Sequence, residues 1–266
     1  MPKDIPARSP MRFAVVTGAS SGIGLALALR LAREGYDLVL VGRDAQRLDE
    51  AAGMVADLGR RVAVRQVDLA DAYALEDLAS DLSAQVPDVL VNNAGFGAYG
   101  SFADADPGLA LAMIDTNVAA LTRLTAAVLP GMRARGAGRI LNVASTGSFA
   151  PLPNAAVYGA TKAYVLSFSE AVAEELAGSP VTVTALCPGA TATRFFARAG
   201  WMRTALSDGI MATPEAVADC GYRAMAAGRR VAVAGFANRL LVLGARLAPR
   251  RLVTAATRRV LAARKA

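Results

Sequence analysis

The sequence RFAVVTGASSGIGLALALRLAREGY, residues 12–36, joins a β-rich run to a glycine-rich turn and an amphipathic helix. Residues 12–17 predict a short buried strand, because they are mainly apolar and include β-branched side chains. In the helix that follows, Ile23, Leu27 and Leu31 recur at helical spacing, and Gly35 lies near its end. A strand, a tight turn and a helix in this order predict the first half of a βαβ unit.

The same alternation continues along the chain. Further strands are expected at 37–42, 61–69, 87–95, 138–145, 181–189 and 230–235, and helices at 44–59, 71–85, 108–135, 155–177 and 213–228. Such alternation indicates a parallel sheet with helices on both faces. We therefore predict an α/β fold in which residues 12–235 form a single doubly wound, Rossmann-type domain with a mostly parallel sheet of about seven strands. Residues 1–11 are expected to be a flexible extension, and residues 236–266 a basic amphipathic helical tail.

Composition narrows the class of protein. Of 266 residues 54% are hydrophobic, none is histidine, and the two cysteines, Cys187 and Cys220, lack metal-ligand spacing. We therefore expect a globular protein without a metal site. No leader or spanning run is recognised, so the expected location is the cytoplasm. Residues 229–266 contain ten Lys or Arg and no acidic residue, whereas the remainder has 19 basic and 22 acidic residues, so nucleic acid is not an expected partner.

The turn TGASSGIG, residues 17–24, is a candidate phosphate-binding loop. Glycines at 18, 22 and 24 allow a tight turn that brings backbone N–H groups against a pyrophosphate at the positive end of the following helix. A glycine-rich turn without a ligand is the alternative interpretation. Its position after the first strand favours cofactor binding.

The second predicted strand ends in GRD, residues 42–44. Proteins that bind NAD usually place an acidic residue here to hold the ribose 2′-hydroxyl, but this chain has Gly42 followed by Arg43. A guanidinium can pair with the 2′-phosphate of NADP, so NADP is the expected cofactor and NAD the alternative. Asp44 weakens this interpretation, and Arg43 as a solvated surface residue is its alternative.

The stretch VYGATKAYV, residues 157–165, places Tyr158 four residues before Lys162. On spacing alone these are two residues on one face of a helix. In a chain without histidine, however, a tyrosine beside a lysine is a candidate for proton transfer at neutral pH. A free phenol has a pKa of about 10. We expect a nearby ammonium and an oxidised nicotinamide to lower the pKa of Tyr158 toward the working range.

These motifs occur in a fixed order with NNAG at 92–95, a serine thirteen residues before Tyr158, and PG at 188–189. Over residues 12–235 the chain resembles the classical short-chain dehydrogenase/reductase family. The resemblance implies a catalytic set of Asn117, Ser145, Tyr158 and Lys162. The cofactor-binding residues expected from the turn, from Arg43 and from the resemblance are Gly18, Ser20, Ser21, Gly22, Ile23, Gly24, Arg43, Asp68, Leu69, Asn92, Ala94, Gly95, Tyr158, Lys162, Pro188, Gly189 and Thr191.

The resemblance also implies what each catalytic residue does. Tyr158 would be the general acid for carbonyl reduction, or the base for alcohol oxidation, and Ser145 would bind the substrate oxygen. Lys162 would bind the ribose hydroxyls of the nicotinamide half, and Asn117 would hold a water in the proton relay. The expected activity is hydride transfer between NADP(H) and a carbonyl or secondary alcohol. A non-catalytic NADP-binding or membrane-associated regulatory protein on the same fold is the alternative, and an epimerase or dehydratase of the extended branch is a third hypothesis.

Aromatic residues predict an apolar substrate pocket. They lie in residues 96–100, 147–153 and 191–211, of which the last is expected to form a mobile lid. The candidates are Phe96, Tyr99, Phe149, Phe195, Phe196, Trp201 and Met202. Packing in the core or in a subunit contact is the alternative for each of them.

The tail carries two apolar stripes with arginines beside them. The first consists of Phe236, Leu240, Leu243 and Leu247, opposite Arg239 and Arg246, and the second, after Pro249, of Leu252, Ala256 and Val260. We expect the stripes to dock on the domain or on a partner subunit, with the arginines solvated. Peripheral contact with an anionic membrane is the alternative. A homodimer or homotetramer is the expected assembly.

Overall fold

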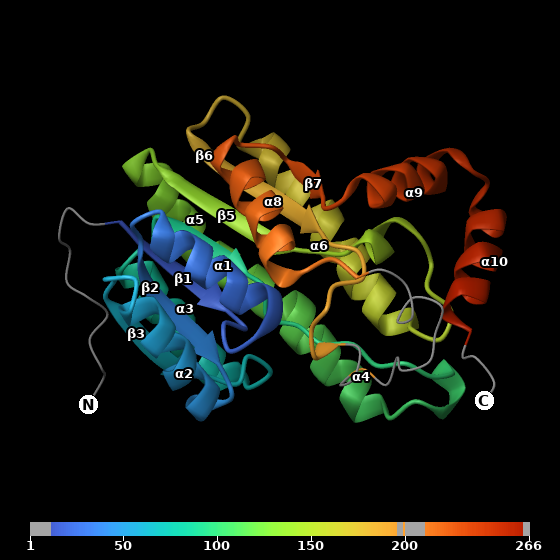
Figure 1. Ribbon diagram of the computed structural model, residues 1–266, viewed down its shortest axis with the longest axis horizontal. Helices are drawn as coiled ribbons and strands as arrows, with labels where there is room; N and C mark the ends of the chain where they lie inside the picture. The colour runs from blue at the N-terminus through green and yellow to red at the C-terminus, as the bar shows by residue number, and fades with distance from the viewer. Residues whose placement is uncertain (1–11, 196–198, 200–210, 263–266) are drawn as a thin grey trace.

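The computed structural model describes residues 12–195, 199 and 211–262. Within them the sheet has seven strands, all parallel, in the order β3-β2-β1-β4-β5-β6-β7 (Figure 1). The strands are β1 Phe13–Thr17, β2 Asp37–Gly42, β3 Val62–Gln66, β4 Val89–Asn92, β5 Gly138–Val143, β6 Val181–Cys187 and β7 Val231–Val233. The direction of strand addition reverses between β1 and β4, whose centres pair through Val15 and Leu90. This is the doubly wound, Rossmann-type arrangement that the sequence predicts.

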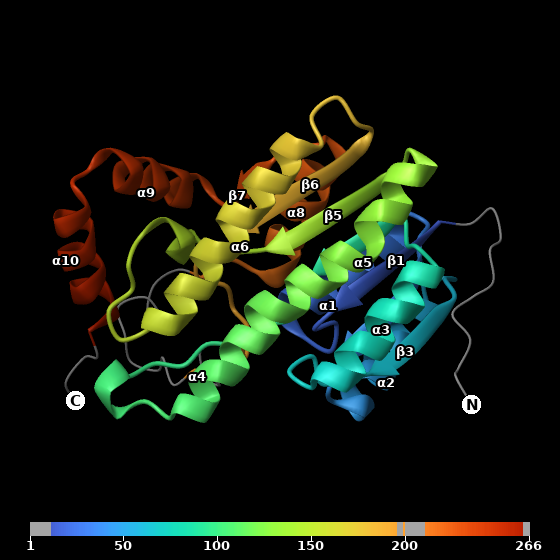
Figure 2. The same cartoon turned by 180° about the vertical axis from the view of Figure 1, so that it is seen from behind.

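Helices cover both faces of the sheet (Figures 1 and 2). Their bounds are α1 Gly22–Arg33, α2 Ala45–Ala56, α3 Ala72–Ala84, α4 Pro107–Ile114, α5 Ala120–Arg135, α6 Ala156–Glu175, α8 Pro214–Ala226, α9 Phe236–Leu247 and α10 Arg250–Leu261. Short helical turns lie at η1 Phe102–Asp104, η2 Asp115–Ala119 and η3 Thr146–Phe149. One core cluster joins α1, α2 and α8 to the sheet, and a second joins α3, α5 and α6 to its other face.

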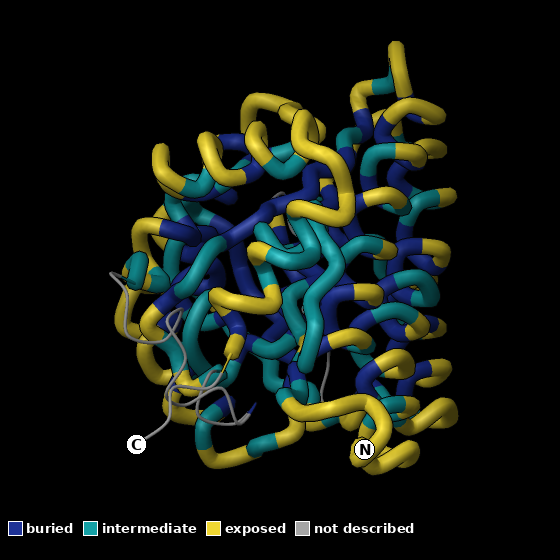
Figure 3. The backbone as a smooth tube through the Cα atoms, turned by 90° about the vertical axis from the view of Figure 1, so that its right-hand side faces the viewer, coloured by how far each residue is buried: buried dark blue, intermediate teal, exposed yellow. Residues whose placement is uncertain are grey.

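Alternation along β1 shows how the two core clusters share one strand. Val15 packs toward α3 and α5, while Ala14 and Val16 pack toward α1 and α8. All five residues of β1 are buried, because both faces of a parallel sheet are covered. Figure 3 shows the same division across the molecule, with buried strands inside and exposed turns of helix outside.

Three predicted strands and one predicted helix differ from the structure in ways that matter for the site. The strands expected at 61–69, 87–95 and 181–189 end earlier, at Gln66, Asn92 and Cys187, since their last residues leave the ladder and form loops. The helix expected at 108–135 is interrupted by a π-helical turn, η2, which turns Asn117 into the protein. Among the described helices, Pro107–Arg135 is also the stretch whose length and composition would suit a membrane span, but in this fold α5 packs against α3.

The tail helices lie against the domain, but their apolar stripes face outward and do not dock on it. Docking of the stripes on a partner subunit stays a prediction. Phe236 and Leu247 are 74% and 78% exposed, and Leu240, Leu243 and Leu252 also face outward. The opposite side of α9 packs inward through Asn238 and Val242. The stripe stays outside because the arginines themselves find partners on the domain: Arg239 donates to the Val233 carbonyl, and Arg246 lies over the Phe149 ring.

A buried polar network fastens the helices that carry the candidate site to the sheet. Asn142 of β5 is fully buried; its Nδ2 donates to Ser169 of α6 at 2.9 Å, and its Oδ1 accepts from Asn92 of β4 at 2.9 Å. Asn92 in turn donates to Thr125 of α5 at 3.1 Å. Buried amides that pair with one another fix relative position more specifically than apolar packing does.

We therefore expect Asn142→Leu to lower the free energy of unfolding by about 2–4 kcal/mol, because two buried partners lose their hydrogen bonds. Urea titration of the full chain measures this change. Thr182→Val is the matched control, since the buried Thr182 hydroxyl has no partner among the described residues. An equal loss of stability in both variants would contradict the role of the network.

Candidate active site

The loops that follow β1, β2, β4, β5 and β6 meet at the carboxyl edge of the sheet, where doubly wound folds bind ligands. Each of these loops carries residues singled out in the sequence. The site is therefore built from segments far apart in the chain, and parallel strand order brings them together.

The glycine turn after β1 has the conformation that an anion-binding turn requires. Gly18 and Gly22 have φ angles of 64° and 59°, a region that favours glycine. A Cβ on Gly24 would lie 2.2 Å from the Gly18 carbonyl oxygen, so no larger residue fits there. Ser21 precedes α1 without capping it through its side chain, within the described residues. The first N–H groups of α1 are thus available to an anion.

Asn93, which the sequence analysis did not single out, joins the loops after β1 and β4. Its Nδ2 donates to the Thr17 and Gly18 carbonyls at 2.9 and 3.2 Å, and its N–H donates to the Thr17 hydroxyl at 3.0 Å. Its neighbour Asn92 was expected to line the cofactor, but its side chain is held in the buried network. Asn93 could have been predicted from the sequence, because it is the second asparagine of the NNAG motif.

Arg43 and Asp68 lie side by side at the ends of β2 and β3. Arg43 Nη1 is 3.7 Å from Asp68 Oδ2, and the two side chains are 63% and 48% exposed. Asp44, the residue that argued against a phosphate site, accepts from the Arg47 N–H and caps α2. Arg43 therefore stands at the expected position with a guanidinium open to solvent. Leu69 is buried in the core.

The π-helical turn places Asn117 beneath the loop after β4. Its Oδ1 accepts from the Phe96 N–H at 3.0 Å, and its Nδ2 donates to the Phe96 carbonyl and to the Thr161 hydroxyl at 2.9 and 3.0 Å. A Cβ on Gly95 would lie 2.8 Å from Asn117 Oδ1 and 3.5 Å from Lys162 Nζ. Gly95 thus allows the loop to approach both residues closely.

Tyr158 and Ser145 form a hydrogen-bonded pair at the start of α6 and the end of β5. Ser145 also accepts from the Gly147 N–H at 3.0 Å, which fixes its side chain. Tyr158 is 7% exposed. Burial raises its pKa to about 12, and the hydrogen bond from Ser145 opposes that rise. In the protein alone the phenol is therefore protonated, because the loss of hydration outweighs one hydrogen bond. The lowering of its pKa that we expect from Lys162 together with an oxidised nicotinamide stays a prediction.

Lys162 lies one turn further along α6 and is also buried. Its Nζ donates to the Val143 carbonyl at 2.7 Å. Burial lowers the pKa of Lys162 to about 8, and the nearby Cys187 thiol acts in the opposite direction. The ammonium that was expected to favour phenolate is thus present at neutral pH, but it loses its proton at a lower pH than a free lysine does.

The proline–glycine loop after β6 closes the site beside Ser145. The Pro188 carbonyl accepts from the Thr146 N–H at 2.8 Å, and the Thr191 hydroxyl donates to the Gly189 carbonyl at 3.0 Å. A Cβ on Gly22 would lie 3.0 Å from the Thr193 methyl group, so the same segment reaches the glycine turn.

Apolar side chains surround Tyr158. The Phe195 ring is tilted by 50° at 5.3 Å from the Tyr158 ring, and Gly97 lies close to both rings. The same cluster includes Met113, Phe96, Tyr99 and Leu152. Of the other predicted pocket residues, Phe149 packs in a neighbouring cluster, while Phe196, Trp201 and Met202 lie outside the described residues.

No group of three or more Cys, Asp or Glu that could hold a metal ion occurs among the described residues.

Comparison with known proteins agrees with this geometry. Residues 12–203 match the family model for short chain dehydrogenases. An uncharacterized short-chain type dehydrogenase/reductase of Sinorhizobium fredii is 42% identical over 187 residues, which cover 69% of this chain and 71% of that protein. The chain therefore belongs to the short-chain dehydrogenase family and is an oxidoreductase.

Two solved structures are also similar. A short-chain dehydrogenase from Sphingobium yanoikuyae in complex with NADPH has a TM-score of 0.81 and 36% identity, covering 89% of this chain and 94% of that one. The bulky-bulky ketone specific alcohol dehydrogenase from Comamonas testosteroni has a TM-score of 0.77 and 30% identity, covering 88% and 91%.

Proposed function

We propose that this protein reduces a carbonyl group on an apolar small molecule with NADPH, and oxidises the corresponding secondary alcohol in reverse, with Tyr158 as the general acid or base. The observation that carries the proposal is the buried, protonated Tyr158 hydroxyl, which is hydrogen-bonded to Ser145. A protein that only binds the nucleotide has no need of such a pair, which argues against a non-catalytic regulatory role.

The residues of the site fit NADP(H). The glycine turn leaves N–H groups of α1 for the pyrophosphate, and Arg43 offers a guanidinium to the 2′-phosphate. Lys162 would bind the ribose hydroxyls of the nicotinamide half. When bound, the cofactor supplies the hydride. The remaining contacts that we propose, with the adenine, the central region and the carboxamide, come from Asp68, Leu69, Ala94, Gly95, Pro188, Gly189 and Thr191.

Proton transfer is assigned to this chain's own residues. Ser145 and Tyr158 would donate hydrogen bonds to the carbonyl oxygen of the substrate. As hydride reaches the carbonyl carbon, the Tyr158 proton moves to that oxygen, and the phenolate left behind is stabilised by Lys162 in its charged form. The side-chain amide of Asn117 already has protein partners, which favours its main-chain carbonyl as the group that would hold a relay water.

Two observations support carbonyl reduction of an apolar substrate. A phenol with a pKa of about 12 keeps its proton at neutral pH and is a poor base, so Tyr158 in the protein alone can donate a hydrogen bond to a carbonyl oxygen but cannot accept a proton. Phe195 and the other side chains around Tyr158 form an apolar wall. The similar alcohol dehydrogenase from Comamonas testosteroni is specific for bulky-bulky ketones, and a ketone of that kind is the class that we propose here. A cytoplasmic homodimer or homotetramer remains a prediction.

Tyr158→Phe should lower turnover with NADPH and a bulky ketone by at least about a hundredfold, the scale of a lost general acid. NADPH affinity should change little, because the ring remains. Initial-rate kinetics and fluorescence titration of NADPH measure the two effects. Tyr164→Phe, on the same helix, removes a hydroxyl that pairs with Thr122 and should leave turnover unchanged. Retained turnover in Tyr158→Phe would exclude it as the acid.

The pH dependence of reduction should follow Lys162 rather than Tyr158. Burial lowers the pKa of Lys162 from 10.5 to about 8, so its charge is present below pH 8 and lost above it. Therefore kcat/KM for ketone reduction should be constant below about pH 8 and fall above it, since kcat/KM reports groups of the free enzyme. Lys162→Arg should be slower but should keep its rate above pH 8, because a guanidinium stays charged. The same fall in both variants would assign the titration to another group.

Arg43→Gln should weaken NADPH binding by about tenfold to a hundredfold and NADH binding much less, since a charge-assisted pair contributes roughly 1.5–3 kcal/mol. Calorimetric titration of both cofactors measures the difference. Arg139→Gln, at the amino end of β5, carries the same change of charge and should affect neither. An equal loss of affinity for NADPH and NADH in Arg43→Gln would show that Arg43 does not bind the 2′-phosphate.

A further inference from the structure

One side of α9 is a continuous apolar face exposed to solvent. Its centre is the stripe of Phe236, Leu240, Leu243 and Leu247, and Leu241 lies at its edge. Each of the five is more than half exposed, and we call them the α9 face. These residues lie on adjacent turns of one helix. Single exposed apolar residues are ordinary, but a contiguous set of five large ones marks an interaction surface.

The tail is anchored with this face outward. Arg239 Nε donates to the Val233 carbonyl at 3.1 Å, and the Arg246 guanidinium lies 5.0 Å from the centre of the Phe149 ring and 3.7 Å from Glu170. In α10 the Thr257 hydroxyl donates to the Pro151 carbonyl at 2.8 Å, and Leu261 is buried. Rotation of α9 to hide its apolar face would break these contacts.

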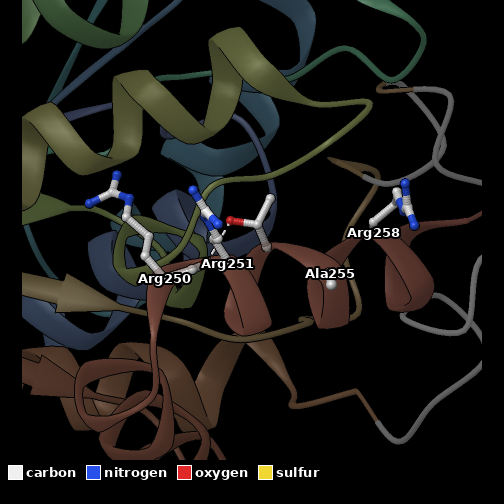
Figure 4. Close-up of a pocket in the computed structure, with 5 residues that line it drawn as sticks. Arg250, Arg251, Ala255 and Arg258 are labelled. Atoms are coloured by element: carbon white, nitrogen blue, oxygen red, sulfur yellow. Dashed lines mark hydrogen bonds between the residues drawn. The ribbon is translucent and has the colours of Figure 1, made fainter.

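The charged residues of the two tail helices have one sign. Residues 236–262 contain six arginines and no acidic residue. Arg250, Arg251 and Arg258 of α10 line a hollow of about 450 Å³, shown in Figure 4, and within the described residues they form no ion pair. Figure 4 shows their guanidinium groups spread along α10, where each can bind phosphate oxygens in a bidentate manner.

We propose that the α9 face and the arginines of α10 together seat this protein on an anionic lipid bilayer. The five apolar side chains enter the boundary between headgroups and acyl chains, and the arginines pair with lipid phosphates. Charge decides against a second copy of the chain, because a twofold contact through this surface would bring together two tails that carry arginines and no acidic residue of their own. An anionic bilayer satisfies both the apolar and the cationic parts of the surface.

Binding of the bilayer through this surface also has a consequence for the substrate. The Tyr99 hydroxyl donates to the Leu261 carbonyl, and Thr257 contacts Pro151, so α10 touches two loops beside the apolar wall of the site. A bilayer on this side would hold that wall near the phase in which an apolar ketone dissolves. This consequence rests on the proposed function, whereas the proposed binding to lipid does not.

The test is flotation of the full chain with vesicles of phosphatidylcholine alone or mixed with an equal amount of phosphatidylglycerol. We expect binding to the mixed vesicles, at least about tenfold weaker binding to phosphatidylcholine, and loss of binding at high salt, where surface charge is screened. Absence of binding to the mixed vesicles by the unmodified protein overturns the proposal.

Variants identify the surface. Leu240→Gln with Leu243→Gln should reduce vesicle binding at least about tenfold without lowering the melting temperature, because both side chains are exposed. Met54→Gln with Tyr73→Gln removes two exposed apolar side chains from α2 and α3 and should leave binding unchanged. Equal binding by the Leu240/Leu243 variant and this control would exclude the α9 face.

Arg251→Gln with Arg258→Gln tests the cationic part, and Arg33→Gln with Arg139→Gln is its charge-matched control. We expect the first pair to weaken the salt-dependent binding at least about tenfold and the control to leave it unchanged. Light scattering measures the molecular mass of the unmodified protein and of the Leu240/Leu243 variant. If the unmodified protein does not bind vesicles and the variant has a lower molecular mass than it, a second copy of the chain occupies the face and the proposal is wrong. Vesicle binding without ketone reduction would refute the proposed function alone.

Discussion

The site depends on one close approach of backbone, between the turn after β1 and the loop after β4. Gly24 has no room for a Cβ against the Gly18 carbonyl, and Asn93 ties the same carbonyl to the loop after β4. The chain leaves β1 for one face of the sheet and leaves β4 for the other, so a crevice opens between the two segments. These contacts therefore fix the distance between two parts of the site: the anion site at the start of α1 and the loop after β4, which contacts Asn117.

Burial is the second constraint, and it acts on Tyr158 and Lys162 in the same sense. Loss of hydration favours the neutral form of each residue, so the pKa of the phenol rises and that of the ammonium falls. At neutral pH the result is a protonated Tyr158 beside a Lys162 that is still charged but loses its proton at a lower pH than a free lysine does. The Asn142 network secures this arrangement, because it fastens α6 to the sheet behind the pair.

In the tail the sequence correctly predicted amphipathic helices, but it did not predict which side of α9 faces the domain. The arginines of α9 have long apolar stems and planar heads, so they pack on Phe149 and reach backbone carbonyls as readily as leucine would pack there. Asn238 fills the space beside Gly189, which admits a small polar side chain. Leucines and phenylalanine are left on the outer side as a consequence, and the surface gains its apolar face.

Much of this protein was determined by sequence alone. Local patterns predicted the seven strands, the glycine turn and the Tyr158–Lys162 pair, because alternation and helical spacing are properties of neighbouring residues. Other features depend on contacts between distant segments. The inward turn of Asn117 through a π-helical turn, the role of Asn93, the pKa of Tyr158 and the outward face of α9 were decided only by tertiary structure. The packing around a residue sets its hydration, its hydrogen-bond partners and which face of its helix is buried. The local sequence does not specify which distant segments pack there.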